Sequence, residues 1–530
     1  MKKLTSSNKT VRIFTTLVLL GLIILSSASC NDNSTNSTSD YSPSDDAVPE
    51  KNAIQPYSDN PNYWQYKEEP IMLIGGSNND NLFQWTGDKL TNHLDSLVAA
   101  GGNYLRLVMS DDDDHDLGEV YAFGQRSNGK YNLNTWNPEY WNRLINFLDK
   151  TSDRDIIVQL TLWDGWDFGG DDGSDWSEHP YNPKNNTNYS TNNTRLPTTW
   201  KEPPWREDHP LFLTVPTLNN DIEVLKFQEA FISKLLSIAL TYNNVLYNIE
   251  NEASTPLEWS DYWAEFIHKE ANATGKKIYV TSMRDNWDIR HQDHLHVLKN
   301  VNLYQFFDAS QNTQMPRRHG EGAGHQIAYE HLLDLKTRIQ QSGQRPVNIV
   351  KTYGAKNSSN GAPSDAGGLQ SFWINIFGGV SAVRFHRPKQ GLGISEIALK
   401  SIKSARMLSD STDFFSMFPK PSLLGNRSQN EAYALANTGK QYAVYFTEGR
   451  EITLDISAIT ADSIEVQWLN ILTASWTDTE LVFKSENTTG PIRKIADKLQ
   501  DLLKISTSIT LSPPDNGPWI ALINPVNKDN

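Results

Sequence analysis

Between residues 70 and 408, short apolar runs rich in β-branched side chains alternate with longer segments whose apolar positions recur every three or four residues. The first pattern is typical of buried strands and the second of amphipathic helices. Residues 224–238 show the helical spacing, with Val224, Phe227, Phe231 and Leu235 in step. The alternation predicts eight strands, at residues 71–75, 104–109, 156–162, 245–249, 278–282, 301–306, 347–350 and 381–385.

Eight strands, each followed by a helix or a long loop, predict an α/β fold, a (β/α)8 TIM barrel over residues 59–420. A doubly wound open sheet is the alternative, but it would rarely need eight such units and would usually carry a glycine-rich nucleotide loop. The sequence has no such loop. Beyond the barrel, short alternating runs such as EITLDIS and SIEVQWLN are separated by Gly, Asn and Pro. They predict a small C-terminal antiparallel β-sandwich over residues 425–530.

Residues 1–29 have the composition of a lipoprotein signal peptide. Basic residues are followed by a mostly apolar run at 13–25, which is shorter than the ~20 residues of a membrane span and typical of a signal peptide. The run leads into Ser-Ala-Ser before Cys30, the single cysteine of the chain. This order resembles the cleavage box of bacterial lipoproteins, so we expect lipidation at Cys30. Ordinary secretion beside an incidental cysteine is the alternative.

Residues 30–58 are rich in acidic and small polar side chains and predict a disordered acidic tether. Acidic residues after a lipidated cysteine resemble the surface-export signal of Bacteroidetes lipoproteins. The resemblance implies a lipid-anchored protein of the cell envelope, at the outer membrane and facing outward. A single cysteine excludes an intramolecular disulfide, so core burial must hold the domains together.

The net charge of the chain limits the classes of partner that it can bind. Its 63 acidic residues outnumber 48 basic ones, for a formal net charge of −15, and such a field disfavours nucleic acid and anionic membranes. We therefore expect no nucleic-acid partner, membrane contact only through the lipid anchor, and a monomer. The 16 Trp and 20 Tyr would serve core packing or sugar stacking equally well.

Polar and aromatic side chains gather at the carboxyl ends of the predicted strands, where TIM barrels build their active sites. Carboxylates, amides, rings and cations that converge on one face indicate a carbohydrate site. In chain order, the candidates are Arg106, Trp163, Asp164, Trp166, Asn251, Glu252, Arg284, Asp285, Trp287, Asp308, Lys351, Tyr353, Arg384, His386 and Arg387.

Asn251-Glu252 at the end of the fourth strand, with Arg106 on the second, resembles the signature of the large clan of retaining glycosidases on TIM barrels. The segments YWQYKEEPIMLIGGS, EHPYNPKNNTNY and FFDASQN are similar to apiosidase-like glycoside hydrolases. The tail NEAYALANTGKQYAVYF…PWIALINP is similar to the collagen-binding-type β-sandwich domain that often follows them. The resemblance implies a glycoside hydrolase with Glu252 as general acid/base and Asn251 on a sugar hydroxyl. A general acid at neutral pH would need a raised pKa at Glu252.

The chain departs from this clan at the seventh strand. The clan places its nucleophilic Glu there, whereas this chain has Lys351 and no acidic residue from 335 to 364. A retaining glycosidase needs two carboxyl groups about 5–5.5 Å apart, and an inverting one about 6.5–9.5 Å. The second carboxylate must therefore come from another strand.

Asp164, Asp285 and Asp308 are the candidates for the second carboxylate. We rank Asp164 first, because Trp163 and Trp166 would offer a stacking platform and lower the local polarity. We expect an inverting mechanism in which Glu252 is the acid and Asp164 the base.

Six cations are expected near the same mouth of the barrel, and they suggest an acidic substrate that carries uronate or sulfate groups. The alternative is that they brace the strand ends through Arg–Asp networks. They are Arg106, Arg284, Lys351, Arg384, His386 and Arg387.

Two other functions stay open. A non-catalytic glycan-binding lipoprotein would have lost the nucleophile and kept the barrel, and a polysaccharide lyase would use Lys351 or Tyr353 as base. We expect no cofactor and no metal, since the acidic runs at 111–116 and 171–175 lack EF-hand spacing.

Overall fold

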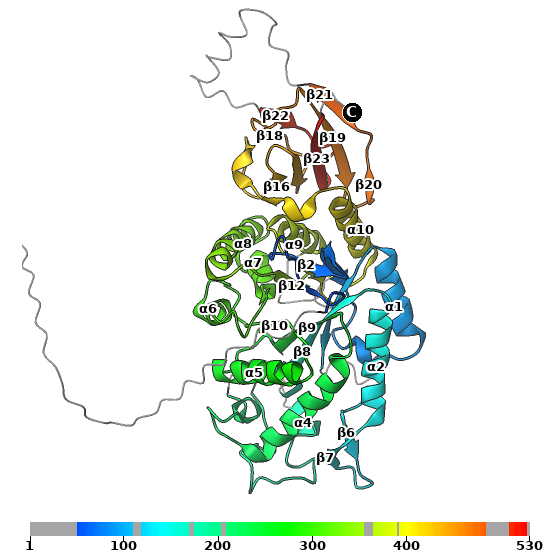
Figure 1. The fold of residues 1–530 in the computed structure, drawn as a ribbon, viewed down its shortest axis with the longest axis vertical. Coiled ribbons are helices and arrows are strands. Elements are labelled where there is room, and N and C mark those ends of the chain that lie inside the picture. Colours follow the sequence, from blue (N-terminus) through cyan, green and yellow to red (C-terminus); the bar gives the residue numbers. More distant parts are fainter. Residues whose placement is uncertain are drawn as a thin grey trace, which may run out of the picture. The chain divides into compact units, whose positions relative to one another are not determined.

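The computed structural model describes residues 50–109, 118–168, 174–202, 208–354, 364–388, 392–483 and 508–526. Figure 1 shows the elements in chain order by colour, from blue to red. The predicted signal peptide, Cys30 and both acidic runs considered for calcium lie wholly or largely outside the described residues. Within the described ranges, no helix has the length and apolar character needed to cross a membrane.

A sheet of eight parallel strands forms the centre of the larger domain, in the order β10-β9-β8-β5-β4-β13-β12-β11. Its two ends approach each other where the Phe306 N–H donates to the Val280 carbonyl at 3.4 Å. The sheet thus closes into a near-barrel, and the predicted TIM barrel is confirmed. The strands are β4 (Leu73–Gly76), β5 (Tyr104–Val108), β8 (Ile157–Asp164), β9 (Val245–Asn251), β10 (Val280–Thr281), β11 (Phe307–Asp308), β12 (Val347–Thr352) and β13 (Ala382–Phe385).

Helices cover the outside of this sheet (Figure 1). In α4, the spaced apolar residues Val224, Phe231 and Leu235 are 0–6% exposed, so the sequence period does mark the buried face. The longer helices are α1 (Asp88–Ala99), α2 (Pro138–Ser152), α4 (Ile222–Ala239), α5 (Leu257–Ala273), α6 (Gln292–Lys299), α8 (Ala323–Ser342), α9 (Asp365–Phe377) and α10 (Glu396–Asp410). Two short helices, α3 (Ser174–Glu178) and α7 (Met315–His319), lie in the loops that follow β8 and β11.

The sixth strand does not lie where the sequence predicted it. β11 comprises Phe307 and Asp308, one residue beyond the predicted range of 301–306. Residues 301–303 form a turn after α6, and Tyr304 donates its hydroxyl to Asp261 on α5. Most of this apolar run therefore belongs to the connection between α6 and β11 rather than to a strand. Sequence alone cannot tell these two cases apart for a short apolar run.

A small antiparallel sheet of β1 (Gln55–Pro56), β2 (Trp64–Tyr66) and β3 (Glu69–Ile71) precedes the barrel strands. Trp64 is fully buried and donates its indole N–H to Asn348 of β12 at 2.9 Å. Ile54 is also buried, and its N–H donates to the Asn243 carbonyl. The predicted tether thus extends too far, because the chain is already ordered against the barrel before residue 58.

Two antiparallel sheets form the C-terminal region, as predicted. They share one apolar core to which Val444, Leu454 and Ile523 contribute, which is the packing of a β-sandwich. The larger sheet contains β14 (Phe418–Pro419), β16 (Ala432–Asn437), β17 (Gln441–Phe446), β23 (Trp519–Val526), β19 (Ser463–Asn470), β20 (Ser475–Trp476) and β21 (Glu480–Phe483). The smaller one contains β15 (Leu424–Gly425), β18 (Ile452–Asp455) and β22 (Ser508–Leu511).

Candidate active site

Glu252 follows β9 directly and has a left-handed backbone, with φ of 49°. Residues other than glycine seldom adopt this backbone conformation, and strained residues of this kind cluster at functional sites. The Ala253 N–H donates to the Met283 carbonyl at 2.7 Å, and the Asp285 N–H donates to the Ala253 carbonyl at 3.1 Å. These hydrogen bonds join the loop after β9 to the loop after β10 and hold Glu252 in its strained conformation.

Three donors from two other strand ends surround the Glu252 carboxylate. The Lys351 ammonium lies 2.5 Å from Oε1, the Tyr353 hydroxyl donates to the same oxygen at 3.2 Å, and the Trp166 indole N–H donates to Oε2 at 3.2 Å. Burial by itself would raise the pKa of Glu252, but the charge and hydrogen bond of Lys351, with Arg106 nearby, lower that pKa to about 2. The carboxylate is therefore ionised at neutral pH.

This charge state contradicts one prediction. A general acid was expected to have a raised pKa, whereas the pKa of Glu252 is lowered. The physical reason is Lys351, which occupies the end of β12 and faces Glu252 from across the mouth of the barrel. Burial is the largest single influence on the pKa of Glu252, but the charge and hydrogen bond of Lys351, together with its other polar neighbours, outweigh it.

Asp285 and Asp293 border the same open space as Glu252, and Asp285 lies on the loop joined to that of Glu252. Asp285 is half-buried and accepts a hydrogen bond from the Ser254 hydroxyl at 3.4 Å. Burial, followed by the negative charge of Glu252, raises the pKa of Asp285 to about 7. The Glu252 and Asp285 carboxyl groups thus have pKa values on opposite sides of the usual range, a separation typical of acid–base pairs in active sites.

Asp164 has a different environment. It is 7% exposed, and burial raises its pKa to about 7 against the opposing charge of Arg106. The Asn251 amide N–H donates to both of its oxygens, at 3.0 and 2.9 Å, and the Trp166 backbone N–H donates at 3.1 Å. Asp164 thus positions Asn251 and the turn that carries Trp166, and it does not line the cleft that Glu252 and Asp285 share.

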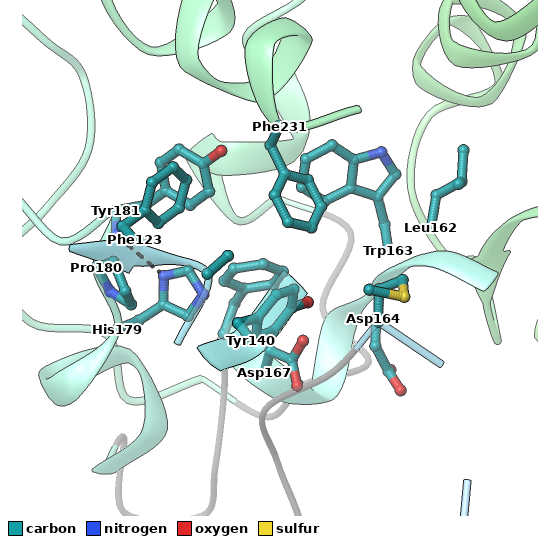
Figure 2. Close-up of a pocket in the computed structure, with 13 residues that line it drawn as sticks. Phe123, Tyr140, Leu162, Trp163, Asp164, Asp167, His179, Pro180, Tyr181 and Phe231 are labelled. Carbon is teal, nitrogen blue, oxygen red and sulfur yellow. Dashed lines mark hydrogen bonds between the residues drawn. The ribbon is translucent and has the colours of Figure 1, made fainter. Parts of the chain in front are cut away.

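The prediction that Trp163 offers a stacking platform is wrong. Trp163 is 4% exposed, and its ring lies 5.7 Å from Phe231 and 5.2 Å from Trp263, so it belongs to the core beneath α4 and α5. Figure 2 shows the Trp163 and Phe231 rings beside each other, with the Asp164 side chain extending away from them. Trp166, which is 37% exposed, is the ring of this segment that does border the cleft.

Most of the predicted cation cluster faces Asp80 on the loop after β4. Arg106 Nη1 lies 3.2 Å from Oδ2, Arg384 Nη2 lies 2.6 Å from Oδ1, and His386 and Arg387 each lie 3.6 Å from Oδ2. Burial opposes ionisation of Asp80, but these neighbours hold its pKa well below the usual value. These four residues therefore hold the strand ends together through Asp80, which was the alternative interpretation of the cation cluster. Their predicted role in binding an acidic substrate is not supported.

Two further residues predicted to lie in the active site, Asp308 and Arg284, instead hold the surrounding loops and strands in place. Asp308 is 2% exposed and accepts hydrogen bonds from the Gln159 amide at 2.7 Å and the Ser310 N–H at 2.9 Å. Arg284 is 4% exposed and donates to the Thr255 carbonyl at 2.6 Å. The predicted contact of Asp308 with substrate is therefore not what the structure shows, because its oxygens are engaged inside the barrel.

The cleft around Glu252 has a volume of about 550 Å³. Trp166 lies on one side of it, Trp287 follows β10, and Gln314, Arg317 and Arg318 come from the segment around α7. These last three residues were not among the candidates predicted from the sequence, although the basic run at 317–319 was a visible signal. Among the described residues, no three side chains of the types that ligate metals come together as a metal site.

Comparison with known proteins agrees with this architecture. Residues 117–317 match a domain of unknown function, DUF6298, and residues 418–497 match the "Putative collagen-binding domain of a collagenase", which supports the resemblance for the C-terminal region. A glycoside hydrolase family 5 protein from Bacteroides vulgatus ATCC 8482 is similar in structure, with a TM-score of 0.58, 11% identity and coverage of 90% of this chain and 95% of that chain.

A second solved structure, described as a glycoside hydrolase, has the same TM-score of 0.58 and 11% identity, and the match covers 90% of this chain and 98% of that chain. At this identity the likeness establishes the fold and leaves the chemistry to the residues themselves. No curated protein matches the chain.

The Asp80 network predicts a large loss of stability when its carboxylate is removed. Asp80→Asn leaves Arg106 and Arg384 buried without their counter-charge, which typically costs about 3–5 kcal/mol. Urea unfolding measures this loss. Asp95→Asn is the matched control, because Asp95 pairs with Arg154 at the surface and such pairs contribute about 0–1 kcal/mol. Equal losses in both variants would contradict the proposed bracing.

The raised pKa of Asp285 predicts a pH-dependent stability. In the folded protein Asp285 keeps its proton up to pH about 7, whereas in the unfolded chain it loses the proton near its ordinary pKa of about 3.9. The folded state binds more protons in this window, so the contribution of Asp285 falls as pH rises. Relative to the parent protein, Asp285→Asn should therefore gain melting temperature steadily between pH 4.5 and 7. The exposed Asp88→Asn should show no such trend, and a parallel pH profile for Asp285→Asn would refute the shift.

Proposed function

We propose that this protein is a glycoside hydrolase of a polysaccharide or oligosaccharide, with its active site in the cleft around Glu252. The observation that carries the proposal is the pair of carboxyl groups on neighbouring strand ends, with a pKa of about 2 for Glu252 and about 7 for Asp285. Both border one open cleft that also presents Trp166 and Trp287. The family 5 glycoside hydrolase fold supports the proposal, and the apiosidase-like subgroup is retained as its finer assignment.

The charge states suggest roles that differ from those predicted by resemblance. Asp285 holds a proton near pH 7 and can donate it to the leaving glycosidic oxygen as the C–O bond breaks. Water then adds its hydroxyl to the anomeric carbon, and Glu252 accepts the remaining water proton. As Asp285 loses its proton, its new negative charge raises the pKa of Glu252, because two interacting sites titrate as a pair. The base thus becomes stronger as the acid is consumed.

Lys351 and Tyr353 position Glu252 in this scheme. Both bind Oε1, and Trp166 binds Oε2, so the carboxylate is fixed at two sides. Because the sequence around β12 has no acidic residue from 335 to 364, we propose direct displacement by water with inversion at the anomeric carbon. Asp164, the second carboxylate of the sequence prediction, acts in this proposal through Asn251 and the Trp166 turn.

One observation favours a second candidate, a glycan-binding protein without catalysis. The Lys351 ammonium neutralises Glu252 at 2.5 Å, which is how a barrel that had lost its nucleophile would stabilise the remaining carboxylate. The third candidate, a lyase, has weaker support. Burial and the charge of Glu252 raise the pKa of Tyr353 well above its usual value, and a base that holds its proton so firmly is poorly suited to proton abstraction.

The hydrolase proposal predicts that Glu252→Gln and Asp285→Asn each lower kcat/KM by about 10²–10⁴-fold, the usual contribution of general acid–base catalysis. Release of reducing ends from a panel of plant and algal polysaccharides, followed by NMR of the first-formed anomer, measures rate and stereochemistry. Glu258→Gln is the matched control, because Glu258 is exposed at the start of α5 and should leave the rate unchanged.

The outcomes of this assay separate the three candidates. A glycan-binding protein would show no reducing ends with any polymer and would keep its affinity in Glu252→Gln. A lyase would release unsaturated products that absorb in the ultraviolet. Full activity in Glu252→Gln would rule out the proposed active site.

We also propose that the mature protein is anchored by a lipid on Cys30 at the outer membrane. The proposal rests on the small residues before Cys30, the apolar run at 13–25 and the acidic segment after the cysteine. In a Gram-negative host fed labelled palmitate, the parent chain should carry label and sediment with membranes. Cys30→Ser should lose both properties, whereas Ser34→Ala, four residues further on, should keep them. A labelled Cys30→Ser protein would overturn the assignment.

A further inference from the structure

We propose that Arg317, Arg318 and Trp287 form a subsite for an anionic sugar, one that carries a carboxylate or a sulfate ester. The inference deepens the proposed function, because it names the substrate class of the same cleft and rests on the cleft being a glycan site. It also replaces the original basis for an acidic substrate, since four of the six cations predicted for that role face Asp80.

The three residues lie on one wall of the cleft that Glu252 and Asp285 border. Arg317 and Arg318 are exposed on α7, and Trp287 is half-buried after β10. The Arg318 guanidinium lies over the Trp287 ring, 4.6 Å from its centroid. Such stacking orients the planar cation and leaves its N–H edge directed outward for a partner.

Within the described residues, the Arg318 guanidinium forms no ion pair with a carboxylate. Burial, followed by the like charge of Arg317, lowers the pKa of Arg318, and Asp285 is the one acid that opposes this effect. Asp285 and Asp293 line the same cleft. The exposed Arg318 guanidinium, oriented by the Trp287 ring and next to the like charge of Arg317, is a group that an incoming anion would stabilise.

This arrangement distinguishes the cleft arginines from the other cations of the site. Arg106 and Arg384 are almost fully buried and face Asp80, and Lys351 is paired with Glu252. Arg290 lies three residues beyond Trp287, and it is held by Asp288 through two hydrogen bonds of 2.8 Å. Those cations stabilise the fold, whereas Arg318 combines exposure, an orienting ring and a cleft.

The chemistry of the wall favours a carboxylate or sulfate on a sugar. A guanidinium edge binds two oxygens of a planar carboxylate or of a sulfate in a bidentate manner, and the partly exposed Trp166 ring also lines the cleft, where it can contact an uncharged part of the glycan. The formal charge of −15 disfavours polyanions over the rest of the surface. Binding of an acidic glycan should thus be confined to this wall and weaken with salt.

Affinity electrophoresis and calorimetry with polygalacturonate, dextran sulfate and neutral dextran test the subsite. The parent protein should bind one of the two acidic polymers and not dextran. The Arg317→Gln/Arg318→Gln double variant should bind that polymer about 10- to 100-fold more weakly, as expected for lost hydrogen bonds to charged groups. Arg290→Gln removes another exposed arginine, one that is paired with Asp288 and does not line this cleft, and it should bind like the parent.

Three results would overturn the inference. They are unchanged affinity in the double variant, equal affinity of the parent for dextran and the acidic polymers, and no binding of either acidic polymer. Repeating the measurement in Glu252→Gln separates the two proposals. Retained acidic binding with no hydrolysis by the parent would leave the subsite standing and remove the hydrolase. If the parent hydrolysed only neutral glycans, the hydrolase proposal would stand and the anionic subsite would be ruled out.

Discussion

The ion pair between Lys351 and Glu252 determines the chemistry available at the mouth of the barrel. Burial of Glu252 opposes its ionisation, and Lys351 stabilises the negative charge against that burial. Burial also raises the pKa of Asp285 on the next loop, the charge of Glu252 raises it further, and Lys351 opposes the rise. The protonation of both carboxyl groups therefore depends on their burial and on the charges that face them at this end of the barrel. In the glycosidase clan that the motif resembles, an acidic residue stands at the strand end where this chain has Lys351. In the proposed mechanism, Lys351 at this position is the reason that Asp285 rather than Glu252 acts as the acid.

The site depends equally on a layer of buried polar groups beneath and beside the cleft. Asp80 contacts guanidinium groups from two strands, Arg106 on β5 and Arg384 on β13. Asp164 holds the Asn251 amide, and Arg284 holds the loop after Glu252. Buried charges are costly unless they are paired and hydrogen-bonded, so such a network fixes the relative positions of the strand ends. This rigidity is what allows Glu252 to keep a strained backbone conformation.

The cations of this protein consequently divide into two groups with different physical roles. Those within the barrel are buried, paired and structural. On α7, Arg317 and Arg318 are exposed, and Arg318 is stacked on the Trp287 ring. Arg318 can therefore exchange water for a substrate anion without leaving a buried charge unpaired. The fold, shared with glycoside hydrolases at 11% identity, places both groups at the same end of the barrel and does not by itself choose a substrate.

The sequence by itself determined the architecture, because strand and helix periods are local patterns that burial imposes along the chain. It also located Glu252, since an Asn-Glu pair after a buried strand is a local signal. It could not place β11, because residues 301–303 form a turn and the strand begins only at Phe307. It left open whether Arg106 and Arg384 bind substrate or brace the strand ends. It could not foresee that Trp163 faces the core or that Asp285 rather than Asp164 borders the cleft with Glu252. Those outcomes depend on which side chains come into contact across the mouth of the barrel. Such contacts determine charge pairing and desolvation, and they join residues far apart in the sequence, so only the tertiary structure decides them.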